Sequence, residues 1–170
     1  NTGVFVYQSF ILESKNWDEY VIAQSFMFYA IFSVITLFIA GPIIDKLTSR
    51  KILPLMNIPS LFAMLILFYF DNYMSSYFLL GLMGISNGLA NVLGSSTWAE
   101  IYGVKYIGSI KALTTSMMVF STAFGTAIFG MIIDFGYSIE VIAMTSFFYM
   151  AVANVLIIVF KRRIQPILIK

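Results

Sequence analysis

The sequence contains no cysteine and no histidine, and only 11% of its 170 residues are charged. Without cysteine the chain cannot form a disulfide, a thiolate metal site or a cysteine nucleophile. Without histidine it lacks the commonest general base and the commonest metal ligand. Soluble domains carry about 25% charged residues, so a chain this poor in charge cannot cover the surface of a soluble fold. These absences exclude a typical soluble enzyme, and we expect neither a metal nor a cofactor.

Two further absences narrow the possible partners. The net charge of +2 is too small to indicate a polyanionic partner, so no nucleic acid is expected. The sequence also has no glycine-rich loop with a lysine that would bind a nucleotide phosphate, so it does not indicate a process driven directly by ATP hydrolysis. What the chain does have is apolar residues, at 60% of the total. This composition predicts a protein that crosses the lipid bilayer several times.

Five apolar stretches, each free of Lys, Arg, Asp and Glu, are long enough to cross a bilayer as helices. They are residues 21–44, 52–70, 77–97, 112–133 and 141–160. Residues 1–12 are apolar but too few to span, and they are typical of the last half of a helix. A β-barrel is excluded because residues 61–70 are apolar on every face rather than alternating. The sequence therefore predicts an all-α integral membrane protein with five full transmembrane helices plus one partial helix.

The charges outside these stretches sort by face. All basic residues except Lys15 lie in segments 45–51, 98–111 and 161–170, which the alternation of spans places on one side. The positive-inside rule assigns that side to the cytoplasm. We therefore expect a cytoplasmic C-terminus, with residues 161–170 as a cytoplasmic tail, in a plasma membrane or an inner membrane.

The first basic loop carries a recognisable spacing of glycine, acid and base. It reads Gly41-Pro-Ile-Ile-Asp45-Lys46-Leu-Thr48-Ser-Arg50-Lys51. This resembles the loop signature of the major facilitator superfamily, G-x-x-x-D-[RK]-x-G-[RK]-[RK]. Gly41, Asp45, Lys46 and Arg50 match, whereas Thr48 stands where the family usually has glycine.

The residues of this loop have two interpretations. Gly41 permits close approach of another helix. Asp45 lies near a helix C-terminus, where the helix dipole disfavours an anion, so it needs a cation such as Lys46 or Arg50. The simpler interpretation is that these charges only set the topology. The resemblance implies instead that Gly41, Asp45, Lys46 and Arg50 form part of a cytoplasmic gate.

A second segment repeats the first loop in the opposite orientation. Gly130-Met-Ile-Ile-Asp134 agrees with Gly41-Pro-Ile-Ile-Asp45 at four of five positions and ends a span at the other face. Transporters built from inverted repeats are expected to show such echoes, although an isoleucine-rich chain also produces them by chance.

The resemblance extends over nearly the whole chain. Residues 2–8 resemble the outer half of the family's seventh helix, and residues 81–88 resemble its glycine-rich tenth helix. This implies that residues 1–160 form a major-facilitator-type helical bundle half, from a truncated seventh helix to the twelfth. It also implies that an N-terminal six-helix half is missing from this chain.

Polar side chains within the spans are candidates for a substrate pathway, and each has a packing alternative. Asn87 and Asn91 share one helix face and either line the pathway or join neighbouring helices. Thr122 and Thr126 either face a wet cavity or bond to their own helix. The resemblance places Gln8 on the cavity-facing part of a gating helix.

The sequence thus favours a secondary active transporter that moves a small solute across a lipid bilayer by alternating access. The six-helix halves of such proteins rock about a site near the midplane. No ionisable residue lies deep in a full span, so a proton relay does not run through this half. The alternative is a non-transporting membrane subunit or assembly partner.

Overall fold

A computed structural model describes residues 2–160, and it is entirely helical apart from short connections. In order, the elements are α1 (Thr2–Val6), α2 (Gln8–Lys15), α3 (Glu19–Leu47), α4 (Ser49–Ile52), the 3₁₀ helix η1 (Leu53–Leu55), α5 (Ile58–Tyr69), α6 (Met74–Tyr102), α7 (Ile107–Asp134) and α8 (Ile139–Phe160). Five segments are long and apolar enough to cross a membrane: α3, Ser49–Tyr69, α6, α7 and α8. The predicted all-α fold with five spans is confirmed. The predicted cytoplasmic tail, residues 161–170, lies outside the described residues.

The helices run past the apolar stretches that predicted them. The third span was expected at residues 77–97, whereas α6 continues to Tyr102 and stops at Gly103, which has a φ of 74°. The second span is interrupted instead of continuous. Pro54 lies in η1 and Pro59 in the first turn of α5, and a proline lacks the N–H that an uninterrupted helix needs.

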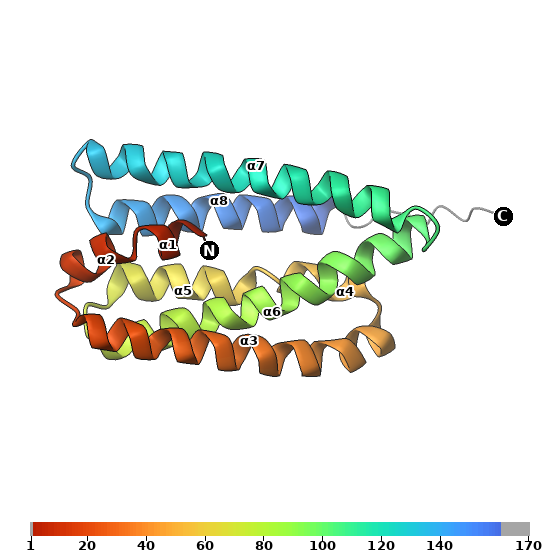
Figure 1. The fold of residues 1–170 in the computed structure, drawn as a ribbon, viewed down its shortest axis with the longest axis horizontal. Helices are drawn as coiled ribbons and strands as arrows, with labels where there is room; N and C mark the ends of the chain where they lie inside the picture. The colour runs from red at the N-terminus through yellow and green to blue at the C-terminus, as the bar shows by residue number, and fades with distance from the viewer. Residues whose placement is uncertain (1, 161–170) are drawn as a thin grey trace.

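The connections between the long helices alternate between the two ends of the bundle (Figure 1). At one end lie the turns from α2 to α3, from α5 to α6 and from α7 to α8. At the other end lie the turns from α3 to α4 and from α6 to α7. We call the end with the α2–α3, α5–α6 and α7–α8 turns the first end of the bundle, and the opposite end the second end. This is the alternation that the five-span prediction requires.

The closest helix pair is α3 with α6, and glycine makes it possible. A Cβ added to Gly84 would collide with the backbone carbonyl of Tyr29. A Cβ at Gly88 would lie 2.7 Å from the Ser33 carbonyl oxygen and 2.7 Å from the Thr36 Cβ. Small residues allow membrane helices to gain packing contacts at short range, since lipid supplies no hydrophobic drive between helices.

The remaining helices pack more loosely around this pair. The main apolar core gathers buried residues of α5, α6 and α8, among them Ala63, Leu67, Leu79, Met83 and Ala143. In contrast, α7 has no buried residue and exposes large apolar side chains such as Phe120 and Phe124.

Candidate functional site

A charged cluster holds three segments together at the first end of the bundle. The Lys15 Nζ lies 2.5 Å from the Asp71 Oδ1 and 3.1 Å from the Glu140 Oε1. The lysine side chain is only 1% exposed, whereas the Asp71 and Glu140 side chains are 78% and 41% exposed. The Trp17 indole N–H donates to the Asp71 carbonyl oxygen at 2.6 Å. The end of α2 is thereby tied to the α5–α6 turn and to the start of α8.

The surroundings of Lys15 act on its pKa in opposite directions. Desolvation by burial lowers the pKa of Lys15, because burial disfavours the charged form. The hydrogen bonds and negative charges of Asp71 and Glu140 raise it, and their combined effect prevails, so the pKa lies above the ordinary value of 10.5. Lys15 is therefore a fixed positive charge near neutral pH.

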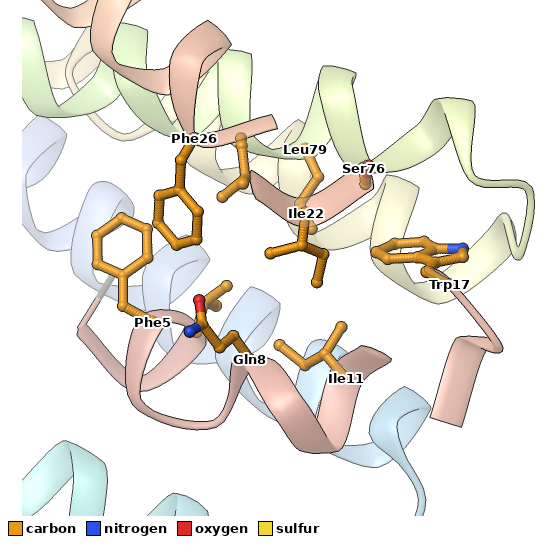
Figure 2. A pocket seen from close by; sticks show the side chains of 10 residues that line it. Phe5, Gln8, Ile11, Trp17, Ile22, Phe26, Ser76 and Leu79 are labelled. Atoms are coloured by element: carbon orange, nitrogen blue, oxygen red, sulfur yellow. The ribbon is translucent and has the colours of Figure 1, made fainter. Parts of the chain in front are cut away.

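Gln8 faces a small apolar pocket inside the bundle (Figure 2). The pocket has a volume of about 20 Å³ and is lined by α1, α2, α3 and α6, with Phe5, Ile11, Ile22 and Phe26 around the amide. The Gln8 Oε1 is buried and has no hydrogen-bond partner within the described residues. A space of this size holds about one water molecule. The structure thus places Gln8 among apolar side chains between these helices.

The first helical segment also contacts α7. The Tyr7 hydroxyl donates to the Thr126 carbonyl oxygen at 3.2 Å, and the Tyr7 ring stacks on Phe129. A Cβ at Gly130 would lie 2.5 Å from the Tyr7 hydroxyl oxygen, so Gly130 leaves room for the tyrosine. Asp134, the other half of the predicted outer-end motif, is exposed at the end of α7.

The two asparagines of α6 differ in their surroundings. Asn87 is half-buried, and its Nδ2 donates to the Ser33 Oγ of α3 at 3.2 Å. Asn91 is exposed and donates to the Asn87 carbonyl oxygen of its own helix at 2.9 Å. Asn87 therefore joins two helices, whereas the Asn91 side-chain amide donates within its own helix.

The α7 hydroxyls bond locally. The Thr126 Oγ1 donates to the Thr122 carbonyl oxygen at 3.0 Å, and Thr122 and Thr126 are both half-buried. Bonds of this kind satisfy a hydroxyl inside a bilayer without a second helix.

At the second end of the bundle, Glu100 connects α6 to α4. The Glu100 Oε1 accepts the backbone N–H of Ser49 at 2.8 Å, and the Glu100 Oε2 lies 3.8 Å from the Arg50 Nε. Both charged side chains are partly exposed, at 27% for Arg50 and 30% for Glu100. This contact holds the start of α4, in the loop of residues 41–51, against the end of α6.

The other loop residues occupy different surroundings from those expected. Within the described residues Asp45 makes no ion pair, and both Asp45 and Lys46 are exposed. A Cβ at Gly41 would meet no described atom within 4 Å, so no close helix approach at Gly41 occurs among the described residues. The close approaches lie at Gly84 and Gly88 instead.

Thr48 occupies the turn between α3 and α4 in an unusual backbone conformation. Its φ of 68° and ψ of 141° lie in a region that favours glycine and disfavours a β-branched side chain. The family loop signature has glycine at this position, and glycine fits the backbone conformation of this turn without strain.

Lys15 and Glu100 are not recognisable as contact residues from local sequence patterns. Each pairs with a residue more than 45 positions away, so no local pattern reveals the contact. A signal was nevertheless present, because Lys15 is the lone base on an acidic face and Glu100 is an acid on a basic face.

Comparisons with known proteins give one result. A family model described as Major Facilitator Superfamily matches residues 1–167. No curated protein and no solved structure matches the chain significantly.

Proposed function

The chain belongs to the Major Facilitator Superfamily, and we propose that it serves as the C-terminal half of a secondary active transporter for a small solute. The observation that carries the proposal is the family match over residues 1–167 of a multi-pass membrane protein. Alternating access is the expected mechanism, with this half rocking against an N-terminal six-helix half.

In this proposal α3, α6 and α7 contribute one wall of the pathway. Asn87 is half-buried and bonded to Ser33, and the exposed Asn91 lies one turn further along the same face. An amide that is partly exposed can exchange a protein partner for a hydroxyl or carbonyl of a solute. Gln8, Thr122 and Thr126 contribute further polar groups. The solute is a small polar or organic molecule, since no charged residue lies deep in a span of this half.

The second end of the bundle is proposed as the cytoplasmic gate. The Glu100 contact with Ser49 and Arg50 holds the α3–α4 turn against α6, and it is partly exposed, so water can compete for it. Asp45 and Lys46 are exposed and available to a partner that arrives in another conformation. The charge distribution supports a cytoplasmic location for this end, in a plasma or inner membrane.

Single cysteines test the pathway, because residues 1–170 contain no cysteine that would have to be removed. In the full transporter reconstituted into liposomes, Asn87→Cys should react with a water-soluble thiol reagent, and transported solute should slow the reaction. Ala63→Cys, which is 0% exposed in the core, is the matched buried control. Phe38→Cys, 78% exposed on α3, tests for lipid exposure without water.

The same experiment addresses the alternative function. If Asn87→Cys is as unreactive as Ala63→Cys in every condition, and the liposomes take up no solute, the chain acts as a membrane subunit or assembly partner. The loosely packed α7 would then be its docking helix, since none of its residues is buried.

A further inference from the structure

A groove of about 320 Å³ opens near the second end of the bundle. It lies between the end of α3, the α4–η1 segment and α6. Its lining consists of Ala40, Ile43, Ile44, Leu47, Lys51, Ile52, Leu55 and Leu89. The volume is at the lower end of the range of sites that bind small organic molecules.

The floor and the walls of the groove are apolar. Ala40, Ile44 and Ile52 form the floor, where they belong to a small buried core with Leu93. Leu47 and Leu55, on either side, are about half exposed, at 49% and 51%. The kink at η1 separates α4 from the straight path of α5 and leaves this surface uncovered. In a bilayer such a hollow accepts a hydrocarbon chain, because no polar group in it requires water.

The rim of the groove is positively charged. Among the described lining residues Lys51 alone carries a charge, and it is exposed at the end of the hydrophobic segment. The same loop carries Lys46 and Arg50, against Asp45 and the Glu100 carboxylate that faces Arg50, so three basic groups stand against two acids. An apolar groove with a basic rim matches a lipid with an anionic headgroup, and each basic residue near such a headgroup contributes to binding.

We propose that this groove binds one anionic phospholipid, with an acyl chain between Leu47 and Leu55 and the headgroup phosphate at Lys51. Zwitterionic phospholipids fit the apolar part equally well but carry no net charge for the basic rim. None of its lining residues is one of the proposed pathway residues, and lipid binding is measured without transport, so the test of this site does not depend on the proposed transport function.

Lipid retention measured by native mass spectrometry tests the proposal. The purified protein is equilibrated with equal amounts of phosphatidylglycerol and phosphatidylcholine in detergent, and the bound lipids are counted. The protein should retain phosphatidylglycerol preferentially. Lys51→Ala should reduce that preference about fivefold, the effect of removing one basic residue near an anionic headgroup. Lys111→Ala is the matched control, because Lys111 is an exposed lysine outside the groove.

A second variant tests the apolar part independently. Leu55→Trp places a large side chain in the groove and should reduce retention of both lipids, while monodisperse gel filtration confirms the fold. Equal retention of the two lipids by the unmodified protein would overturn the proposal. So would equal effects of Lys51→Ala and Lys111→Ala, or unchanged lipid retention by a folded Leu55→Trp protein.

Discussion

The buried ammonium of Lys15 lies within hydrogen-bonding distance of both Asp71 and Glu140, two carboxylates 69 positions apart in the chain. The asymmetry of this cluster is its main feature, because the cation is 1% exposed and both anions reach water. Removing the cation therefore leaves two carboxylates that can be hydrated, whereas removing the carboxylates leaves a buried charge. The cluster joins three segments that meet only at the first end of the bundle.

Lys15→Met tests how much the cluster stabilises the fold. Methionine keeps most of the apolar stem and removes the charge, so the loss reflects the ionic hydrogen bonds. We expect the free energy of unfolding to fall by roughly 1.5–3 kcal/mol, the range for hydrogen bonds to a charged group, and by less than for a fully buried ion pair, because the carboxylates left behind are hydrated. Denaturant titration in micelles measures the change. Lys111→Met, at an exposed site, should leave stability unaltered, and equal losses in the two variants would contradict the interpretation.

The pH dependence of this stabilisation follows from the raised pKa of Lys15. A cation whose pKa is higher in the folded state stabilises the fold fully below its unfolded value of 10.5, and the stabilisation is lost as the pH rises through the folded pKa. The stability difference between the native protein and Lys15→Met should therefore stay constant from about pH 6 to 9 and shrink above 10.5. A change centred near neutral pH would show that another group controls the cluster.

Substitution by alanine should have opposite effects on stability at two glycines of α6. Gly88→Ala forces α3 and α6 apart, because the new Cβ would lie 2.7 Å from the Ser33 carbonyl oxygen. It should lower stability by about 1–3 kcal/mol. Gly94→Ala meets nothing within 4 Å and should raise stability by up to about 1 kcal/mol, since alanine favours the helix. Thermal unfolding of the two variants distinguishes them, and a loss at both sites would contradict the close contact at Gly88.

Thr48→Gly should stabilise the turn between α3 and α4. Glycine tolerates the φ of 68° without the strain of a branched side chain, and its greater flexibility in the unfolded chain offsets part of the gain. The expected net increase is about 1 kcal/mol in the free energy of unfolding. Thr48→Ala is the control, because alanine keeps a Cβ at the same φ. A similar gain from alanine would show that strain at Thr48 is not the cause.

Glu100→Gln tests the proposed gate. Glutamine can still accept the Ser49 N–H, but it loses the charge that faces Arg50. For a partly exposed pair we expect the ratio of inward-facing to outward-facing states to change by up to about fivefold. The labelling rate of Asn87→Cys from each side of the membrane reports this ratio. Glu13→Gln, at an exposed acid of the first end, should not alter this ratio. An unchanged ratio in Glu100→Gln would mean that Glu100 only caps the start of α4 and does not control the gate.

The sequence predicts the helices well and the contacts between them poorly, for physical reasons. A long apolar run determines a membrane helix by itself, so all five spans are predictable from composition alone. Pairings such as Lys15 with Asp71, or Ser49 with Glu100, depend on which helix ends meet, and that information is not local. Glycine is the instructive case, because Gly41 and Gly88 both lie inside long helices, yet among the described residues Gly88 lies against another helix and Gly41 does not.

The Ser25 hydroxyl donates to the Val21 carbonyl oxygen and also lies 2.7 Å from the Ser76 hydroxyl oxygen. These two contacts become available at different moments of biosynthesis. When α3 enters the bilayer, α6 has not yet arrived there, and only the bond to Val21 can satisfy the serine in lipid. The second bond forms when the later helix arrives beside it. The buried serine can thus enter the bilayer with its donor already bonded, and it gains its partner on α6 during assembly.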